Sequence, residues 1–365
     1  MAIHEPNLPV EERHPEYRLR RIKLWSRILG HGAIAKLVSY AECAARMIWA
    51  GLRVKPHLIH ANDLSALPIA DVLGRVTRAR VVYDSHELWS DPDYPSYKRF
   101  PNWVIRLAVL TEKYLARRAA AVITVSDGIA NRMAATIPIP TPVVVRNLPN
   151  KLRDGFRAGQ NLLHSALNLD PTVLIILHLG IVCEERGIET LIAALKAVDE
   201  PAVVVLLGSA DSYRYVERLK ELAREIGVEK RIYFVPPVPS DEVCSFISDA
   251  AVGVSLLRNS CLNHQLALPN KLFEYLQAGV PVVVNGSSEK ERLVKAYQVG
   301  ETFVDGDATG LAKALNLILA DGGTRDRYKI MVQKAAAELN WQREEERLVS
   351  IYQRVSSNEP LLVEC

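Results

Sequence analysis

The feature that most constrains the fold is a repeated alternation of short apolar runs and amphipathic helical stretches. The runs are rich in Val, Ile and Leu and show no polar alternation, as in "AVVVLLG" at 202–208 and "PVVVN" at 281–285. Strands covered by helices on both faces have this pattern, because neither face meets water. We therefore predict an α/β protein with parallel, doubly wound sheets.

The apolar runs fall into two series, which predicts two sheets. The first series lies at 57–61, 80–85, 120–126 and 142–147, and the second at 173–180, 202–208, 231–238, 250–257, 281–285 and 300–304. A chain of 365 residues also exceeds one ordinary hydrophobic core. We expect two Rossmann-like domains, at 1–148 and 172–340, joined by a linker at 149–171.

The charge is distributed unevenly between the two halves. Residues 1–150 carry 21 Lys and Arg against 13 Asp and Glu, a net +8, whereas the remaining 24 and 29 give −5. The basic residues cluster at 17–30 and 112–121 among apolar side chains, which we interpret as basic helices. Such a surface is typical of a solvated helix face, and it also suits peripheral contact with an anionic membrane. No recognition motif accompanies the charge, so we do not expect nucleic acid as a partner.

The cysteines and the hydropathy pattern indicate a cytoplasmic protein. No apolar run approaches the roughly 20 residues of a membrane span, and no signal-peptide core begins the chain. Five cysteines show neither metal spacing nor a paired framework, which fits reduced thiols: Cys43, Cys183, Cys244, Cys261 and Cys365.

The segment "LPNKLFEYLQAGVPVVV" at 268–284 predicts a helix that leads into a buried strand. Pro269 suits the start of the helix, and Gly279 suits the left-handed residue after its last turn. Lys271 and Glu274 are three residues apart and share one helix face. Taken alone, that spacing indicates a surface ion pair.

Two loops that follow strands carry candidate functional residues. In "LHLGIVCEERGIETL", Arg186 lies at a helix start, where backbone N–H groups and a guanidinium together suit a diphosphate. In "VVYDSHELWSD", His86 follows a strand end, where an imidazole can contact a phosphate or a sugar hydroxyl. His60 ends the neighbouring strand and is either a second site residue or a support for His86.

Asp91 and Asp93 match the Asp-x-Asp pattern that holds a metal in some enzymes that use nucleotide sugars. They lie in the proline-rich loop "SDPDYPSYKRFP", however, and turn chemistry accounts for them. We therefore predict no metal site.

The ordered pieces resemble glycosyltransferase family 4. The resemblance covers nearly everything after residue 56, and its most specific block is "LPNKLFEYLQAGVPVV". The other matching pieces are "HANDL", "VVYDSHEL", "AAAVITVSDGIANRM", "VVVRNLPN", "LGIVCEERGIETLIAAL", "VVVLLGSA" and "LNWQREEERLVSIYQRV". The variants Asp-Ser-His-Glu and Arg-Gly-Ile-Glu resemble the polysaccharide-biosynthesis branch of the family.

The resemblance implies a retaining enzyme of the GT-B fold that uses a nucleoside-diphosphate sugar as donor and no separate cofactor. Glu274 matches the glutamate that binds the donor ribose, Arg186 the basic residue beside the diphosphate, and His86 the histidine between donor and acceptor. These three are the predicted catalytic residues. The predicted donor-binding residues are Gly180, Gly187, Asn263, Ala267, Leu268, Pro269, Asn270 and Lys271. A glycan or lipid-linked acceptor is expected, and a closing helix at 341–356 is expected to cross back onto the first domain.

The chain departs from the family pattern at three places. Position 266 is leucine where the family has its first glutamate, which leaves Asn263, His264 or Gln265 to hold the sugar. Ile181 replaces an arginine that often follows Gly180. The glycine-rich first loop and its strand are also absent, and we expect a start codon assigned too far downstream. These departures keep two alternatives open: a non-catalytic scaffold and a nucleotide-sugar epimerase on the same fold.

Overall fold

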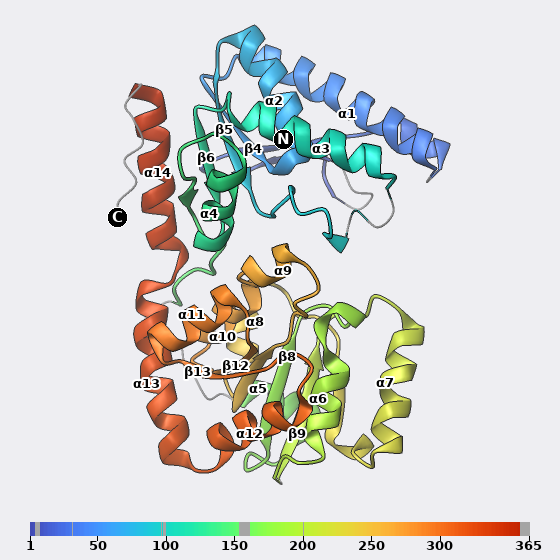
Figure 1. The fold of residues 1–365 in the computed structure, drawn as a ribbon, viewed down its shortest axis with the longest axis vertical. Coiled ribbons are helices and arrows are strands. Elements are labelled where there is room, and N and C mark those ends of the chain that lie inside the picture. The colour runs from blue at the N-terminus through green and yellow to red at the C-terminus, as the bar shows by residue number, and fades with distance from the viewer. Residues whose placement is uncertain are drawn as a thin grey trace.

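The computed structural model describes residues 1–3, 8–30, 32–95, 97, 100–152, 161–199 and 201–357. It has two lobes, each built around a parallel sheet with helices on both faces (Figure 1). The α/β class predicted from the apolar runs is therefore correct.

The first lobe contains a four-stranded parallel sheet whose strands follow chain order. Its strands are β4 (Leu58–Asn62), β5 (Arg80–Ser85), β6 (Ala121–Thr124) and β7 (Val143–Val144). The helices of this lobe are α1 (Ala33–Val54), α2 (Asp63–Thr77), α3 (Asn102–Ala116) and α4 (Asp127–Thr136).

The basic stretch at 17–30 is not a helix, contrary to our expectation. It contains strand β3 (Arg18–Ile22) and a short 3-10 helix (Ser26–Leu29). β3 pairs with β1 (Ala2–Ile3) and β2 (Glu11–Arg13) in a separate small sheet. Exposure alternates along β3 and only Ile22 is fully buried, so the stretch follows the period of a strand and not that of a helix.

The second lobe contains a six-stranded parallel sheet in the order β10-β9-β8-β11-β12-β13. Its strands are β8 (Leu174–Leu179), β9 (Ala202–Leu207), β10 (Ile232–Val235), β11 (Val252–Ser255), β12 (Val282–Asn285) and β13 (Gly300–Phe303). The helices are α5 (Leu162–Leu167), α6 (Ile188–Leu195), α7 (Tyr213–Glu225), α8 (Val243–Phe246), α9 (Leu262–Leu266), α10 (Asn270–Gln277), α11 (Ser288–Tyr297), α12 (Ala308–Leu319) and α13 (Gly322–Glu338).

This strand order places a topological switch point between β8 and β11, which pair directly. The chain runs outward through β9 and β10 on one side and through β12 and β13 on the other. Loops diverge at such a point and leave a crevice outside the carboxyl ends of the strands. The loops after β8 and β11 therefore border the natural ligand site of this lobe.

The closing helix α14 (Trp341–Ser357) lies against the first lobe, although α13 before it belongs to the second (Figure 1). Ile351 and Val355 pack with Val82, Ile123 and Val145 of the first sheet. Glu344 is buried at the base of the helix and accepts a hydrogen bond from the Arg146 backbone N–H at 3.1 Å. The end of the chain thus provides a further connection between the two lobes.

None of the helices in the described part of the chain combines the length and the apolar character needed to cross a membrane.

Candidate functional site

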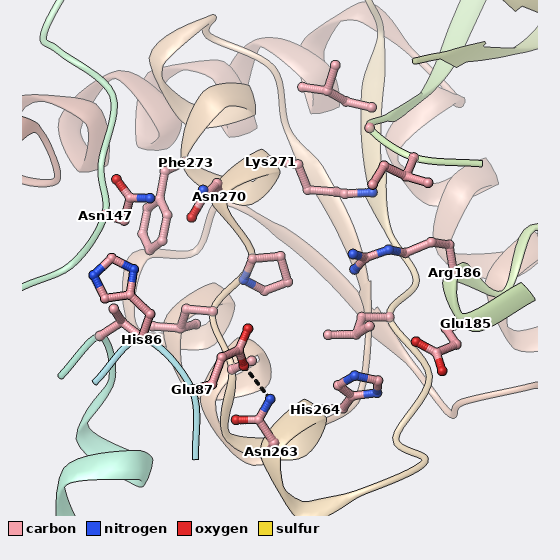
Figure 2. A pocket seen from close by; sticks show the side chains of 18 of the residues that line it. His86, Glu87, Asn147, Glu185, Arg186, Asn263, His264, Asn270, Lys271 and Phe273 are labelled. Carbon is pink, nitrogen blue, oxygen red and sulfur yellow. Dashed lines mark hydrogen bonds between the residues drawn. The ribbon is translucent and has the colours of Figure 1, made fainter. Parts of the chain in front are cut away.

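A pocket of about 580 Å³ lies between the lobes, outside the carboxyl ends of β8 and β11 (Figure 2). The first lobe contributes His86, Glu87, Val125 and the segments at 94–95 and 146–147, and the second lobe contributes the other walls. Ten of the eleven predicted site residues line this pocket: His86, Gly180, Arg186, Asn263, Ala267, Leu268, Pro269, Asn270, Lys271 and Glu274.

Gly187 does not line the pocket, contrary to the expectation from the resemblance. It joins the 3-10 turn at Glu184–Arg186 to α6 and has a φ of +60°. A Cβ at this position would lie 2.9 Å from the Leu256 carbonyl oxygen. Glycine is therefore needed here for the left-handed conformation and for the close approach of two backbones. Its contribution is to shape the loop that carries Arg186.

Gly180 borders the pocket just after β8, with a φ of +103°. Its missing side chain leaves room above Lys271, whose Nζ would lie 3.8 Å from an added Cβ. The conformation, more than the space, requires glycine at this position.

Lys271 is a cation of the site whose ammonium is buried without a hydrogen bond to any described residue. It lies in the first turn of α10, is 9% exposed, and its Nζ has no hydrogen-bond partner within the described residues. Burial lowers its pKa to about 7, the Arg186 guanidinium adds to the effect, and Glu274 opposes it. A buried ammonium without a counter-charge is costly unless an anion joins it.

Arg186 extends toward the same part of the pocket from the opposite wall (Figure 2). No Asp or Glu of the described residues forms an ion pair with it, whereas nearby Arg218 and Arg258 are paired with glutamates. Two cations that form no ion pair with any described residue thus face one cavity. That arrangement suits a ligand with more than one negative charge, such as a diphosphate.

Glu274 lies one turn after Lys271 on α10 and also borders the pocket. Burial raises the pKa of its carboxyl, and the nearby Lys271 partly offsets this. The side chains between and beside them, Leu272, Phe273 and Tyr275, are buried in the core. The amphipathic character of this short helix therefore directs its two charged residues into the cleft.

His86 enters the pocket from the first lobe, immediately after β5. Its Nε2 lies 3.1 Å from Asp84 Oδ2, and its backbone N–H donates to Asp63 Oδ1 at 3.1 Å. The hydrogen bond to Asp84 raises the pKa of His86, with further contributions from Asp63 and Glu87. The imidazole is thus held in one orientation and its charged form is favoured.

Asn263 lines the pocket, but its amide is already engaged in contacts between the lobes. Its Oδ1 accepts from the Leu88 backbone N–H at 2.6 Å, and its Nδ2 donates to Glu87 Oε2 (Figure 2). Asp91 Oδ2 accepts from the Asn263 backbone N–H at 2.7 Å. The expectation that Asn263 holds the donor sugar therefore conflicts with its observed partners, which make it part of a clasp between the lobes.

Leu266, at the position of the missing family glutamate, also joins the lobes. Together with Leu262 it packs against the core of the first lobe, next to Gly128. Its carbonyl oxygen accepts from Ser126 Oγ at 2.8 Å. We call α9 with these contacts the interlobe clasp. His264 still lines the pocket, whereas Gln265 does not.

The Asp-Pro-Asp segment forms the turn that we expected, together with a contact that we did not expect. Asp91 Oδ1 accepts from the Asp93 backbone N–H at 3.1 Å, while Oδ2 bonds to the clasp. Asp91 is only 3% exposed. Within the described residues, no group of three metal-ligating side chains comes together.

Sequence reasoning missed Arg146 and Asn147, which line the pocket from the loop after β7. Their signal was present, because both are polar residues at the end of the predicted strand at 142–147. Arg146 contacts Asp127 at 3.2 Å and Glu344 at 3.7 Å, so its charge is shared with the base of α14.

The two lobes match two descriptions of one kind of protein. Residues 160–335 match the family of glycosyl transferases group 1, and residues 3–149 match the glycosyl transferase 4-like domain. The chain belongs to the family-4 type of glycosyltransferases. The resemblance read from the "LPNKLFEYLQAGVPVV" block is therefore confirmed.

Solved structures confirm the GT-B fold of this glycosyltransferase. Sucrose-phosphate synthase from Thermosynechococcus elongatus superposes with a TM-score of 0.78 at 20% identity, over 98% of this chain and 88% of that chain. Anabaena HepE in complex with UDP-glucose superposes with a TM-score of 0.68 at 18% identity, over 87% of this chain and 81% of that chain.

Curated relatives are glycosyltransferases as well. The D-inositol 3-phosphate glycosyltransferase of Xylanimonas cellulosilytica is 27% identical over 204 residues, 55% of this chain and 47% of its own length. The lipopolysaccharide core biosynthesis glycosyltransferase LpsE of Rhizobium meliloti is 28% identical over 187 residues, 51% of this chain and 50% of its own. The aligned regions thus span about half the length of these relatives.

Proposed function

We propose that this glycosyltransferase moves a hexosyl group from a nucleoside-diphosphate sugar to an acceptor hydroxyl in the interlobe cleft, with retention at the anomeric carbon. The observation that carries the proposal is the unpartnered Nζ of Lys271, which faces the same cavity as the Arg186 guanidinium. The complex of HepE with UDP-glucose supports a nucleotide-sugar donor.

The two cations suit the charge that develops during transfer. The acceptor oxygen approaches the anomeric carbon from the face of the leaving group, bonds to it and passes its proton to an oxygen of the departing diphosphate. The old bond from the anomeric carbon to the diphosphate breaks, and the diphosphate leaves with the electron pair. Negative charge therefore grows on the leaving group, where Lys271 and Arg186 stabilise it. Burial lowers the pKa of Lys271 to about 7 in the protein without a ligand. A bound diphosphate would favour the protonated amine and so raise this pKa.

The other two predicted catalytic residues have different tasks. Glu274, on the same helix as Lys271, would accept hydrogen bonds from donor hydroxyls, as the resemblance implies for the ribose. His86 reaches the pocket from the opposite lobe, so it would meet the transferred sugar and the incoming acceptor. The pocket volume of about 580 Å³ falls in the usual range for a small-molecule site.

The acceptor would be a glycan, a lipid-linked sugar or a small hydroxyl compound. The names of the relatives include both a lipopolysaccharide core enzyme and a D-inositol 3-phosphate enzyme, which supports either size. A wider groove continues from the pocket, and Pro95 and Glu185 border both spaces.

Peripheral contact with an anionic membrane is a separate part of the proposal. Trp25 and Trp49 are exposed, and each stacks with an arginine, Arg46 or Arg53. Indole and guanidinium groups together suit a headgroup region. Cosedimentation with vesicles that contain anionic lipid should be strong at low salt and weak at 1 M salt. Vesicle binding that does not change with salt concentration or lipid charge would refute this contact.

A thermal-shift panel of UDP, GDP and ADP tests the donor site. A nucleotide at 100 times its dissociation constant stabilises the protein by about 2.7 kcal/mol. We expect at least one nucleotide to do so with the wild type and with Lys295→Ala, whose amine forms only an exposed ion pair. Lys271→Ala should lose the shift. If no nucleotide binds, or if both variants respond alike, the proposed donor site is wrong.

A non-catalytic scaffold is the alternative that Leu266 supports, because it replaces a family glutamate and packs between the lobes. A scaffold of this kind would show the nucleotide shift without any release of nucleoside diphosphate from a panel of sugar nucleotides and acceptors.

A further inference from the structure

Four side chains from separate parts of the fold form a continuous polar chain that ends in the pocket. Tyr352 of α14 lies with its Oη 2.8 Å from His60 Nδ1, at β4. His60 Nε2 lies 3.1 Å from Asp84 Oδ2, at β5. The same Oδ2 lies 3.1 Å from His86 Nε2, and His86 borders the pocket. Tyr352 is thus connected to the cleft through His60, which lies 292 positions earlier in the chain.

The hydrogen-bond rules determine which ring nitrogens carry protons. Hydrogen bonds from His60 and His86 lower the pKa of Asp84 against the opposing effect of burial, so Asp84 is ionised and can only accept. Both Nε2 atoms must then donate. A neutral imidazole protonated at Nε2 accepts at Nδ1, so Tyr352 donates to His60 Nδ1.

The same logic leaves one nitrogen of His86 for a ligand. Its Nε2 is engaged with Asp84, and its side chain remains 39% exposed toward the cleft. We propose that Tyr352, His60 and Asp84 are positioning residues that hold His86 as the Nε2–H tautomer and present its Nδ1 to the pocket. This inference rests on the proposed function only for the identity of the group that Nδ1 meets.

The proposal gives His86 two states with different uses. When neutral, its Nδ1 accepts a hydrogen bond from a sugar or acceptor hydroxyl; when protonated, Nδ1–H donates to a phosphate or sugar oxygen. The carboxylates of Asp84, Asp63 and Glu87 favour protonation of His86, and burial of the ring opposes it. The other charged groups that border the pocket are Arg146, at the loop after β7, and Arg186, Lys271 and Glu274 from the second lobe.

Long-range ¹H–¹⁵N NMR of the imidazoles tests the relay in the nucleotide-free protein. The chain has nine histidines, so His60→Gln and His86→Gln serve to assign the signals. In the wild type we expect both neutral rings to be Nε2–H tautomers. Asp84→Asn should lower the pKa of His86 and produce a mixture of its tautomers. Tyr352→Phe, which preserves packing, should produce a mixture of tautomers at His60.

Asp63→Asn is the matched control. Asp63 bonds to the His86 backbone and not to its ring, and Asn suits its positive φ of 62°. The variant should lower the pKa of His86 and leave its tautomer unchanged. A wild-type His86 with its proton on Nδ1, or a tautomer unaffected by Asp84→Asn, would overturn the relay. An unchanged His60 in Tyr352→Phe would remove Tyr352 from it.

These outcomes can be told apart from failure of the proposed function. The NMR experiment needs no donor, acceptor or turnover, so the tautomers can be as proposed in a protein that transfers no sugar. Conversely, loss of the relay would leave nucleotide binding by Lys271 and Arg186 intact.

Discussion

Lys271, which we propose to bind the donor diphosphate, destabilises the free protein. Its ammonium is buried without a partner, and this lowers its pKa to about 7, far below the ordinary value of about 10.4. Between these two values the unfolded chain binds more protons than the folded protein, so the free energy of unfolding rises with pH. The energetic penalty is complete below about pH 7 and fades as the pH approaches 10.

Replacing this lysine by a similar apolar side chain should therefore stabilise the protein. We expect Lys271→Met to raise the free energy of unfolding by about 1 to 2 kcal/mol at pH 6, with a smaller gain at pH 9. Urea unfolding of nucleotide-free protein at both pH values measures this difference. A destabilised variant at pH 6, or a gain that grows with pH, would contradict the assigned state of Lys271.

At the scale of residues, the sequence predicted where the site residues lie better than it predicted their hydrogen-bond partners. The places of His86 and Arg186 after strands predicted their convergence, because parallel strands bring their carboxyl ends together. The resemblance implied the other site residues, and ten of the eleven line one pocket. The partners of Asn263 and His60 depend on segments 175 and 292 residues away. Local patterns hold no information about such contacts, so Asn263 was assigned to the sugar and Tyr352 was missed.

Among the elements, α9 is the one whose task differs most from the family pattern. It carries apolar contacts through Leu262 and Leu266, and polar contacts through Asn263, onto the first lobe. The loop that it precedes, at 267–269, lines the pocket together with Asn270 and Lys271 at the start of α10. The clasp therefore connects the first lobe directly to the start of that loop.

Weakening the clasp should open the free protein. Asn263→Ala removes two side-chain bonds to Glu87 and Leu88, and we expect a larger radius of gyration by small-angle X-ray scattering than in the wild type. Gln265→Ala, on the same helix, removes a side chain that donates to the Asn259 carbonyl oxygen within the second lobe, and this variant should scatter like the wild type. Identical scattering from all three proteins would show that the clasp does not hold the lobes together.

Helix α14 belongs structurally to the first lobe, and two of its valines offer a matched test. Val355 is 3% exposed within the first-lobe core, whereas Val349 is 44% exposed. Val355→Ala should lower the free energy of unfolding by about 1.5 to 3 kcal/mol. Val349→Ala should change it by less than about 0.5 kcal/mol. Equal losses in urea unfolding would mean that α14 does not dock as described.

The elements themselves were predictable to different degrees. Unbroken β-branched runs such as Val282–Asn285 identified the strands of the second sheet, because strands buried on both faces need no alternation. The helix predicted at Arg18–Ile22 rested on its cluster of basic and apolar residues, whereas the exposure of its side chains alternates with the period of a strand. Its strand character also depends on pairing with Ala2–Ile3, far outside any local window.

For the whole molecule, the central claim is that two lobes form one donor site. The strand order of the second sheet puts the crevice between β8 and β11. Helix α14 and the clasp connect the two lobes at two separate places. The second-lobe cations and His86 of the first lobe then face the same cavity. Transfer requires this convergence, because donor and acceptor must meet with water excluded.

Turnover with the sugar nucleotide whose base is selected by the binding panel tests this claim most directly. We predict release of nucleoside diphosphate by the wild type and by Arg224→Ala, whose exposed ion pair lies away from the pocket. Arg186→Ala and Glu274→Ala should each lower kcat/KM at least about 100-fold, the loss of one strong transition-state contact. Wild-type rates in both of these variants would contradict the account.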